Sequence, residues 1–251
     1  MRMLSANMCL SHRLTHRTET SDSDTKEVTL ENTDFQAAKD RVRERLNKFT
    51  AKAFQMLPKM DKPRILDVGC GSGVPTMKLA ELSNGHITAL DIDQDAIDRL
   101  KRKITESGLS GRVKAIRGSM LDIDLPKESF DVVWAEGSIN HIGFKRGLTE
   151  WGQFLKPKGC LAVHDEKDNL NHKLDEIPPC GYELLGYFNL DEQTWKKEYY
   201  FPIQRLISET RSKHGGDRDM LALVDKEQQE IDLFKKNPAR CCSVFFVMRK
   251  R

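Results

Sequence analysis

The sequence contains no apolar run long enough to cross a bilayer. A transmembrane helix needs roughly 18 to 20 consecutive apolar residues, and the longest candidate here is the short run from Val244 to Met248. We therefore expect no membrane span. With 251 residues, 38% of them hydrophobic and 31% charged, the composition indicates a soluble globular chain that forms one large domain, or one domain with appendages.

The cysteines show no metal-binding or disulfide pattern. They are Cys9, Cys70, Cys160, Cys180, Cys241 and Cys242. None are paired as C-x-x-C and no histidine lies at zinc-finger spacing, so we expect no structural metal site. Free thiols in a reducing cytoplasm are the simplest interpretation.

The sequence also lacks a basic region suited to nucleic acid. Its net charge is only +3, and Arg249, Lys250 and Arg251 alone account for this excess. A footprint on phosphates needs basic residues spread over one face. We therefore interpret the excess as a solvated C-terminal tail and expect no nucleic-acid partner.

The first thirty residues lack a sustained apolar period and are rich in Ser, Thr, Arg and His. We expect residues 1–30 to form a flexible N-terminal extension. Acidic residues are absent before Glu19, as in a transit peptide, but the apolar core of a secretory signal is missing.

Beyond this extension, the pattern predicts a helix over 35–57 and then a regular alternation of strands and helices. Strand-like runs lie at 64–68, 86–90, 113–117, 130–135 and 159–163, and helical stretches at 75–82, 95–106 and 144–155. Such alternation requires parallel pairing through right-handed crossovers. The sequence therefore predicts an α/β fold with a doubly wound sheet.

After residue 165 the regular alternation of strands and helices ends. A polar segment leads to a strand at 182–188, then to a long helical region at 192–236 broken near residues 215 and 216, and to a last strand at 243–249. This part of the chain is expected to add two strands and a helical insertion to the alternating core.

The most informative segment is the run ILDVGCGSG at residues 65–73. It follows a strand and opens a helix, so its backbone N–H groups can face a ligand without interference from Cβ atoms. Gly69, Gly71 and Gly73 form G-x-G-x-G rather than the dinucleotide pattern G-x-G-x-x-G, and Asp67 precedes them.

A second carboxylate, Asp91, ends the next strand. It lies about 20 residues beyond the loop, the offset at which a carboxylate accepts hydrogen bonds from ribose hydroxyls. The loop contains no lysine, and Asp67 would repel a pyrophosphate but attract an ammonium or a sulfonium. The two acids therefore argue against a phosphate-rich ligand.

The segments LDVGCGSG, ALDID, FDVVWAEGS and FLKPKGCLAV, in this order, resemble the successive motifs of class I S-adenosylmethionine-dependent methyltransferases. The resemblance covers about residues 64–165, and the small-molecule branch, which includes quinone-biosynthesis methyltransferases, is the nearest. It implies a Rossmann-like sheet of seven strands with an antiparallel last strand, and a helical insertion before that strand. The implied activity is methyl transfer from S-adenosylmethionine to a small molecule by in-line displacement.

Carried over position by position, the resemblance implies that the glycines line the methionine part of the cofactor and that Asp67 holds the loop or the amino group. Asp91 would bind the ribose hydroxyls, and Ile92, Ser119 and Met120 would face the adenine. Glu136 would face the methionine end. The full cofactor set is Asp67, Gly69, Gly71, Gly73, Asp91, Ile92, Ser119, Met120 and Glu136. The simpler alternative is that the loop makes only a tight turn and that Met120 belongs to the core.

Methyl transfer depends mainly on alignment of the reacting atoms, and it needs a general base only if the acceptor must lose a proton. Candidates at the ligand-binding edge of the sheet are Glu136, His141, His164 and Asp165. We select His141 as base or positioning group because it follows the fourth strand directly. A histidine that only caps a helix or bonds to backbone is the alternative.

The resemblance divides residues 31–251, the methyltransferase domain, into an N-terminal helix at 31–62, a cofactor-binding core at 63–165 and a substrate side at 166–251. Trp195, Tyr199 and Tyr200 lie on the substrate side, where they form either a lid over the acceptor or ordinary core. Three other functions stay open: a methyltransferase acting on nucleic acid or protein, an NAD(P)-binding oxidoreductase, and a cofactor-binding protein without catalysis.

Overall fold

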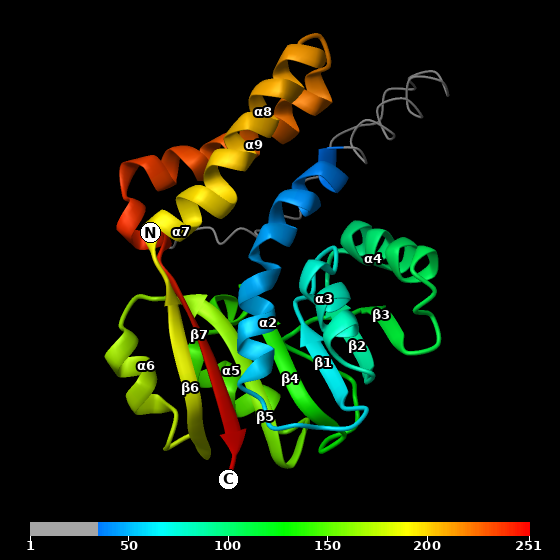
Figure 1. Ribbon diagram of the computed structural model, residues 1–251, viewed down its shortest axis with the longest axis vertical. Helices are drawn as coiled ribbons and strands as arrows, with labels where there is room; N and C mark the ends of the chain where they lie inside the picture. The colour runs from blue at the N-terminus through cyan, green and yellow to red at the C-terminus, as the bar shows by residue number, and fades with distance from the viewer. Residues whose placement is uncertain (1–34) are drawn as a thin grey trace.

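The computed structural model describes residues 35–251, which fold around one seven-stranded sheet (Figure 1). The strands are β1 (Arg64–Val68), β2 (His86–Asp91), β3 (Val113–Arg117), β4 (Phe130–Glu136), β5 (Leu155–Glu166), β6 (Tyr182–Leu190) and β7 (Ser243–Lys250). Their order is β3-β2-β1-β4-β5-β7-β6. Only the pairs made by β7 are antiparallel, which confirms the predicted Rossmann-like sheet and its antiparallel last strand.

Helices cover both faces of this sheet (Figure 1). The described part of the chain begins with helical residues 35–43. The helices that follow are η1 (Glu44–Leu46), α2 (Asn47–Gln55), α3 (Val74–Leu82), α4 (Gln94–Glu106), η2 (Ile139–His141), α5 (Phe144–Gly152) and α6 (Leu170–Glu176). The insertion between β6 and β7 contains α7 (Glu192–Trp195), the π-helix η3 (Lys196–Tyr200), α8 (Phe201–Lys213), α9 (Arg218–Lys236) and η4 (Pro238–Cys241). In Figure 1, α8 and α9 lie side by side and extend past the edge of the sheet.

Alternation along the central strands divides the apolar side chains between two clusters. Ile65 and Trp134 belong to the cluster beneath α2, α3, α4 and the insertion, whereas Leu66 and Val133 belong to the cluster beneath α5. Successive side chains of a strand point to opposite faces. Each central strand is therefore buried on both sides, as a parallel sheet requires.

Two expected boundaries are wrong. The helix predicted to reach residue 155 ends at Gly152, and β5 begins at Leu155 and continues through Pro157. The pairing of β4 with β5 is irregular between Phe130 and Val132, next to the proline. A proline inside a sheet is tolerated at such an irregularity. Pro157 therefore lies within the strand, although a proline usually indicates that a strand ends.

The polar segment after β5 contains a helix, α6, that the sequence did not predict. Its Leu170 and Leu174 lie one turn apart and pack against the cluster beneath α5. Two leucines in seven residues are too weak a signal for a helix.

The expected start of α4 is confirmed. The Asp93 side chain accepts hydrogen bonds from the first turn of this helix.

No helix within residues 35–251 is both long enough and apolar enough to span a bilayer. The predicted N-terminal extension at 1–30 lies outside the residues that the structure describes.

Candidate functional site

The glycine loop makes a tight turn between β1 and α3. Gly69 has φ +74° and Gly73, which precedes α3, has φ +80°; L side chains rarely adopt such values. A Cβ on Gly69 would lie 2.4 Å from the Cβ of Ser138. Glycine is therefore required at Gly69 both by the backbone conformation and by the close approach of the loop after β4.

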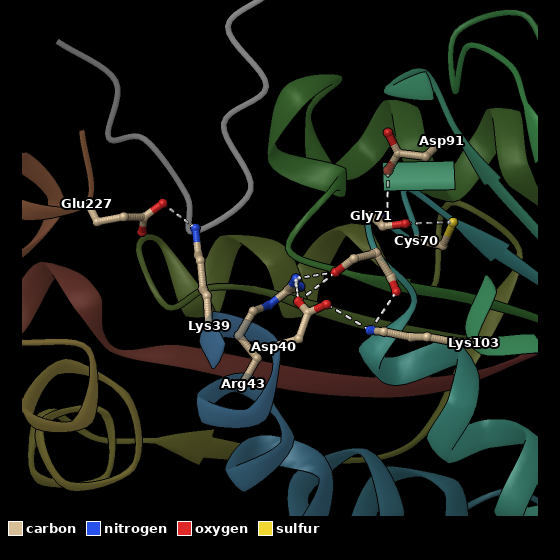
Figure 2. Close-up of polar contacts among 9 residues, drawn as sticks. Lys39, Asp40, Arg43, Cys70, Gly71, Asp91, Lys103 and Glu227 are labelled. Atoms are coloured by element: carbon tan, nitrogen blue, oxygen red, sulfur yellow. Dashed lines mark hydrogen bonds and ion pairs between the residues drawn. The ribbon is translucent and has the colours of Figure 1, made fainter. Parts of the chain in front are cut away.

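Asp91 shapes this loop from the end of β2. Its Oδ2 accepts a hydrogen bond of 2.7 Å from the N–H of Gly71, and its Oδ1 accepts one of 2.9 Å from the N–H of Asp93. Figure 2 shows the Asp91 carboxylate facing Gly71. Each carboxylate oxygen has a second lone pair, so Asp91 retains the capacity to accept two further hydrogen bonds from a ligand.

Asp67 lies beneath the loop and is 1% exposed. Its Oδ2 accepts a hydrogen bond of 2.6 Å from Thr76 Oγ1, which ties β1 to the first turns of α3. Burial raises the pKa of Asp67 to about 7, and the neighbouring carboxylates of Glu136 and Asp91 raise it further. Asp67 is therefore placed to hold the loop rather than to touch a ligand.

The residues expected around the adenine follow β2 and β3. Ile92 is 54% exposed and presents an apolar side chain next to Asp91. Ser119 Oγ accepts a hydrogen bond from the N–H of Leu121. Met120 is half-buried, and its Cε would lie 3.5 Å from a Cβ on Gly69. Ile92 thus leaves open apolar surface, whereas Met120 packs beside the loop.

A cavity opens at the carboxyl ends of β4 and β5, with about 1170 Å³ of empty space including its mouth. It is bounded by the N-terminal helices, the loop after β4 and the insertion. Its lining includes Arg43, Glu136, His164, Asp165, Glu166, Trp195, Tyr199, Tyr200, Glu230, Phe234 and Phe245. Open α/β sheets bind ligands at this edge, so the cavity is the candidate substrate site.

Glu136 is held at the cavity wall by two donors. Thr50 Oγ1 and Trp134 Nε1 donate hydrogen bonds of 2.9 and 2.8 Å to its Oε1. Burial raises the pKa of Glu136 to about 7. Both of these bonds end on Oε1, so among the described residues Oε2 remains available to a ligand in the cavity.

The cavity includes His164 and Asp165 but not His141. His141 belongs to η2 and is exposed. His164 stacks on Phe245 at 4.3 Å and lies 2.7 Å from Ser243 Oγ, and burial lowers its pKa to about 4, so its ring is neutral at pH 7. Asp165 forms a 2.8 Å ion pair with Lys173.

The aromatic residues of the insertion line the cavity and also pack in the core. Trp195 is 9% and Tyr199 1% exposed, and Trp195 Nε1 donates a hydrogen bond of 2.9 Å to Ser243 Oγ. These side chains are therefore part of the core and also part of the cavity lining, and the lid stays a prediction.

Sequence reasoning missed the N-terminal helix as part of the site. Asp40 accepts hydrogen bonds of 2.7 Å from Ser72 Oγ and from Lys103 Nζ (Figure 2). Lys39 pairs with Glu227 of α9 at 2.5 Å. The helix at 35–43 is thus tied both to the glycine loop and to the insertion.

The Arg43 side chain lies next to this network and lines the cavity. It lies 3.6 Å from Asp40 and 3.4 Å from Ser72 Oγ. The sequence does not distinguish Arg43 from the neighbouring Arg41 and Arg45, so it gives no signal for such a position. Arg43 supplies the positive charge that the glycine loop itself lacks.

Comparison with known proteins matches residues 65–159 to a family described as "Methyltransferase domain". Residues 65–159 therefore resemble a methyltransferase domain. The match begins in β1 and ends within β5, so this methyltransferase domain contains the glycine loop, Asp91 and Glu136. The resemblance found in the sequence is confirmed.

Two relatives show how far the similarity extends. Sterol 24-C-methyltransferase erg-4 of Neurospora crassa is 28% identical over 169 residues, and the match covers 56% of this chain and 45% of that protein. The 27-O-demethylrifamycin SV methyltransferase of Amycolatopsis mediterranei is 28% identical over 155 residues, 59% of this chain and 57% of that protein. The chain spans about half the length of the relatives it matches.

A solved structure extends the likeness of fold beyond the methyltransferase domain. The S-adenosylmethionine-dependent methyltransferase of Thiobacillus denitrificans, in complex with S-adenosyl-L-homocysteine, superimposes with a TM-score of 0.62 at 19% identity. The likeness covers 80% of this chain and 90% of that one. At this identity the comparison shows the shared fold.

Proposed function

We propose that the chain is an enzyme that transfers a methyl group from S-adenosylmethionine to a small-molecule acceptor by in-line displacement. The observation that carries this proposal is the arrangement at one sheet edge. Asp91 holds the glycine loop, and Val74 and Pro75, which follow this loop, line the cavity together with Glu136. The matched methyltransferase domain supports the same conclusion.

The residues present fit this cofactor. Asp91 keeps free lone pairs for two hydroxyls, and Ile92 offers exposed apolar surface to an adenine. Glu136 presents a carboxylate to the cationic methionine end. Ser119 and Met120 stay predicted contacts at the adenine rim, and Gly71 and Gly73 predicted contacts of the methionine part.

Bound S-adenosylmethionine would supply an electrophilic methyl carbon on a sulfonium. The protein then has to align the acceptor and exclude water, because alignment accounts for much of the acceleration of a displacement. The cavity is suited to this, since Trp195, Tyr199 and Phe245 enclose it with aromatic rings. His141 stays a predicted base, and His164 and Asp165 are the other predicted candidates.

The acceptor is proposed to be a small molecule. The relatives named for a sterol and for demethylrifamycin support this choice, as does a cavity enclosed by the protein's own side chains.

The proposed location is the cytoplasm. The described cysteines are free, which supports the reducing cytoplasm expected from the sequence.

A methyl-transfer screen tests the proposal. The protein is incubated with methyl-labelled S-adenosylmethionine and separate pools of small molecules, RNA and protein. We expect label to enter a small-molecule pool in wild type and to be lost in Asp91→Ala. Labelling of RNA or protein alone would contradict the small-molecule proposal, and binding without transfer to any pool would contradict catalysis.

A further inference from the structure

The insertion forms one side of the cavity with a cluster of aromatic rings. Tyr200 and Phe234 stack with centroids 3.9 Å apart, and Tyr199 meets Tyr200 edge-on at 5.2 Å. Trp195 meets Tyr199 edge-on at 5.8 Å. We refer to Trp195, Tyr199, Tyr200 and Phe234 as the aromatic cluster. Aromatic faces attract cations through their quadrupole.

A half-buried carboxylate lies beside the aromatic cluster. Glu230 belongs to α9, one helical turn before Phe234, and lines the cavity. It makes no hydrogen bond or ion pair with any residue that the structure describes. Burial raises its pKa to about 7 and the charge of Glu227 raises it further, against the opposing charges of Lys39 and Arg43. A half-buried carboxylate without a partner is costly unless a ligand supplies one.

A second polar group on this side is also unsatisfied. The hydroxyl of Tyr199 is buried without a hydrogen-bond partner in the described chain, although Tyr199 lines the cavity. Burial and the nearby carboxylates of Glu230 and Glu227 raise its pKa, so the hydroxyl stays protonated. Tyr199 Oη can accept a hydrogen bond from a ligand donor. Tyr199 and Glu230 line the same cavity.

We propose that Glu230, Tyr199 and the aromatic cluster bind an ammonium group, and that the methyl acceptor is an amine carried on an apolar body. This inference rests on the proposed methyl transfer. An ammonium supplies N–H donors to Glu230 and Tyr199, for which the described residues provide none, and the positive charge that aromatic faces favour. The remaining apolar wall of the cavity fits a hydrocarbon or ring.

The opposite charge does not fit this side of the cavity. A carboxylate or phosphate on the acceptor would meet Glu230, Glu136 and Glu166, which all line the cavity. Like charges in such a site repel strongly. Among the described residues that line the cavity, Arg43 is the one arginine or lysine. Its guanidinium already contacts Asp40 and Ser72.

Methyl transfer from bound S-adenosylmethionine to an amine would begin with the transfer of a proton to Glu230. The bound ammonium gives one proton to the Glu230 carboxylate, which leaves a lone pair on nitrogen. That pair forms the new N–C bond to the methyl carbon while the C–S bond breaks and its electron pair stays on sulfur. A carboxyl group with a raised pKa accepts such a proton near neutral pH more readily than an ordinary one.

The test compares two probes that differ in charge. Phenethylamine is a cation at pH 8, and 2-phenylethanol has a similar shape without the charge. Calorimetric titration of the full chain with each probe, with S-adenosylhomocysteine present, should show at least about tenfold tighter binding of phenethylamine, as expected for a charged hydrogen bond. Weaker or equal binding of phenethylamine would overturn the proposal.

Variants locate the effect. Glu230→Gln should remove the preference for phenethylamine and leave 2-phenylethanol binding unchanged, whereas Glu230→Asp should keep part of the preference. Asp232→Asn is the matched control, because Asp232 is an exposed carboxylate two residues further along α9 and is not part of the cavity lining. It should behave as wild type. A preference that survives in a folded Glu230→Gln protein would overturn the assignment.

The two proposals can fail separately. Binding of S-adenosylhomocysteine is measured first, without a probe. If it fails while the charge preference depends on Glu230, the amine site stands and the proposed methyl transfer fails. If it succeeds while the preference is absent, the amine acceptor is wrong and the methyl transfer stands.

Discussion

The backbone N–H of Gly71 donates a hydrogen bond of 2.7 Å to the Asp91 carboxylate. The residue expected to bind the ribose therefore also holds the glycine loop in place. Because this hydrogen bond lies within the chain, the loop is shaped by β2 before any ligand binds. Substitutions at Asp91 should consequently affect the loop and the cofactor together.

Asp91→Ala should weaken binding of S-adenosylhomocysteine by at least about tenfold, because hydrogen bonds to a charged group are worth about 1.5 to 3 kcal/mol. Asp91→Asn should weaken it less, since the amide retains one acceptor oxygen. Asp98→Ala, at a surface position of α4, should have no effect. Calorimetry measures all three, and unchanged affinity in Asp91→Ala would remove Asp91 from the site.

Gly69→Ala should destabilise the chain far more than Gly108→Ala. Both positions have positive φ, but a Cβ on Gly69 would lie 2.4 Å from Ser138 Cβ, whereas nothing lies within 4 Å of one on Gly108. Backbone strain costs about 1 to 2 kcal/mol at either site, and overpacking adds about 1 to 3 kcal/mol at Gly69 alone. Denaturant unfolding gives the difference, and equal losses would contradict the tight loop.

Asp67 makes stability depend on pH. Its pKa is about 7 in the folded chain, because of burial, against an ordinary value of 3.8. The folded state therefore binds more protons between these values, and the free energy of unfolding falls as pH rises from about 4 to about 7. At 1.36 kcal/mol per pKa unit the contribution is about 4 kcal/mol at most.

Asp67→Asn should remove this contribution while keeping an acceptor for Thr76. Relative to wild type, the variant should gain stability as pH is raised from 5 to 8, as seen in melting temperatures at each pH. Asp98→Asn serves as the control at an exposed carboxylate. A difference between Asp67→Asn and wild type that does not change with pH would show that Asp67 is ionised throughout.

His141→Ala tests the predicted base against the observed cavity. His141 is exposed and lies outside the cavity lining, so the geometry favours a kcat within about threefold of wild type, whereas loss of a general base costs about 10²- to 10⁴-fold. Steady-state methyl transfer to an identified acceptor decides between them. A loss of about a hundredfold or more would restore His141 as the base.

The sequence was sufficient for the fold because the alternation of strands and helices is strong and the glycine loop marks the first crossover. It was insufficient where a residue type misleads. Pro157 indicates a break but lies inside β5, and α6 has only Leu170 and Leu174 to reveal it. Local composition cannot show that an irregular strand pair accommodates a proline.

The candidate site divides in the same way. Gly69 and Asp91 are close in sequence and belong to one unit made of β1, the glycine loop, α3 and β2. Their spacing was therefore sufficient to predict that they lie at one site. Arg43 and Glu230 lie almost at opposite ends of the described chain and come together only because helix 35–43 and α9 pack over the same sheet edge. No spacing rule connects such residues.

The central claim is that this chain binds S-adenosylmethionine at the loop held by Asp91. Calorimetric titration with S-adenosylmethionine, S-adenosylhomocysteine and NADH tests it most directly. We predict saturable binding of the first two at micromolar concentration and none of NADH. Absence of heat with both, together with saturable binding of NADH, would contradict the account.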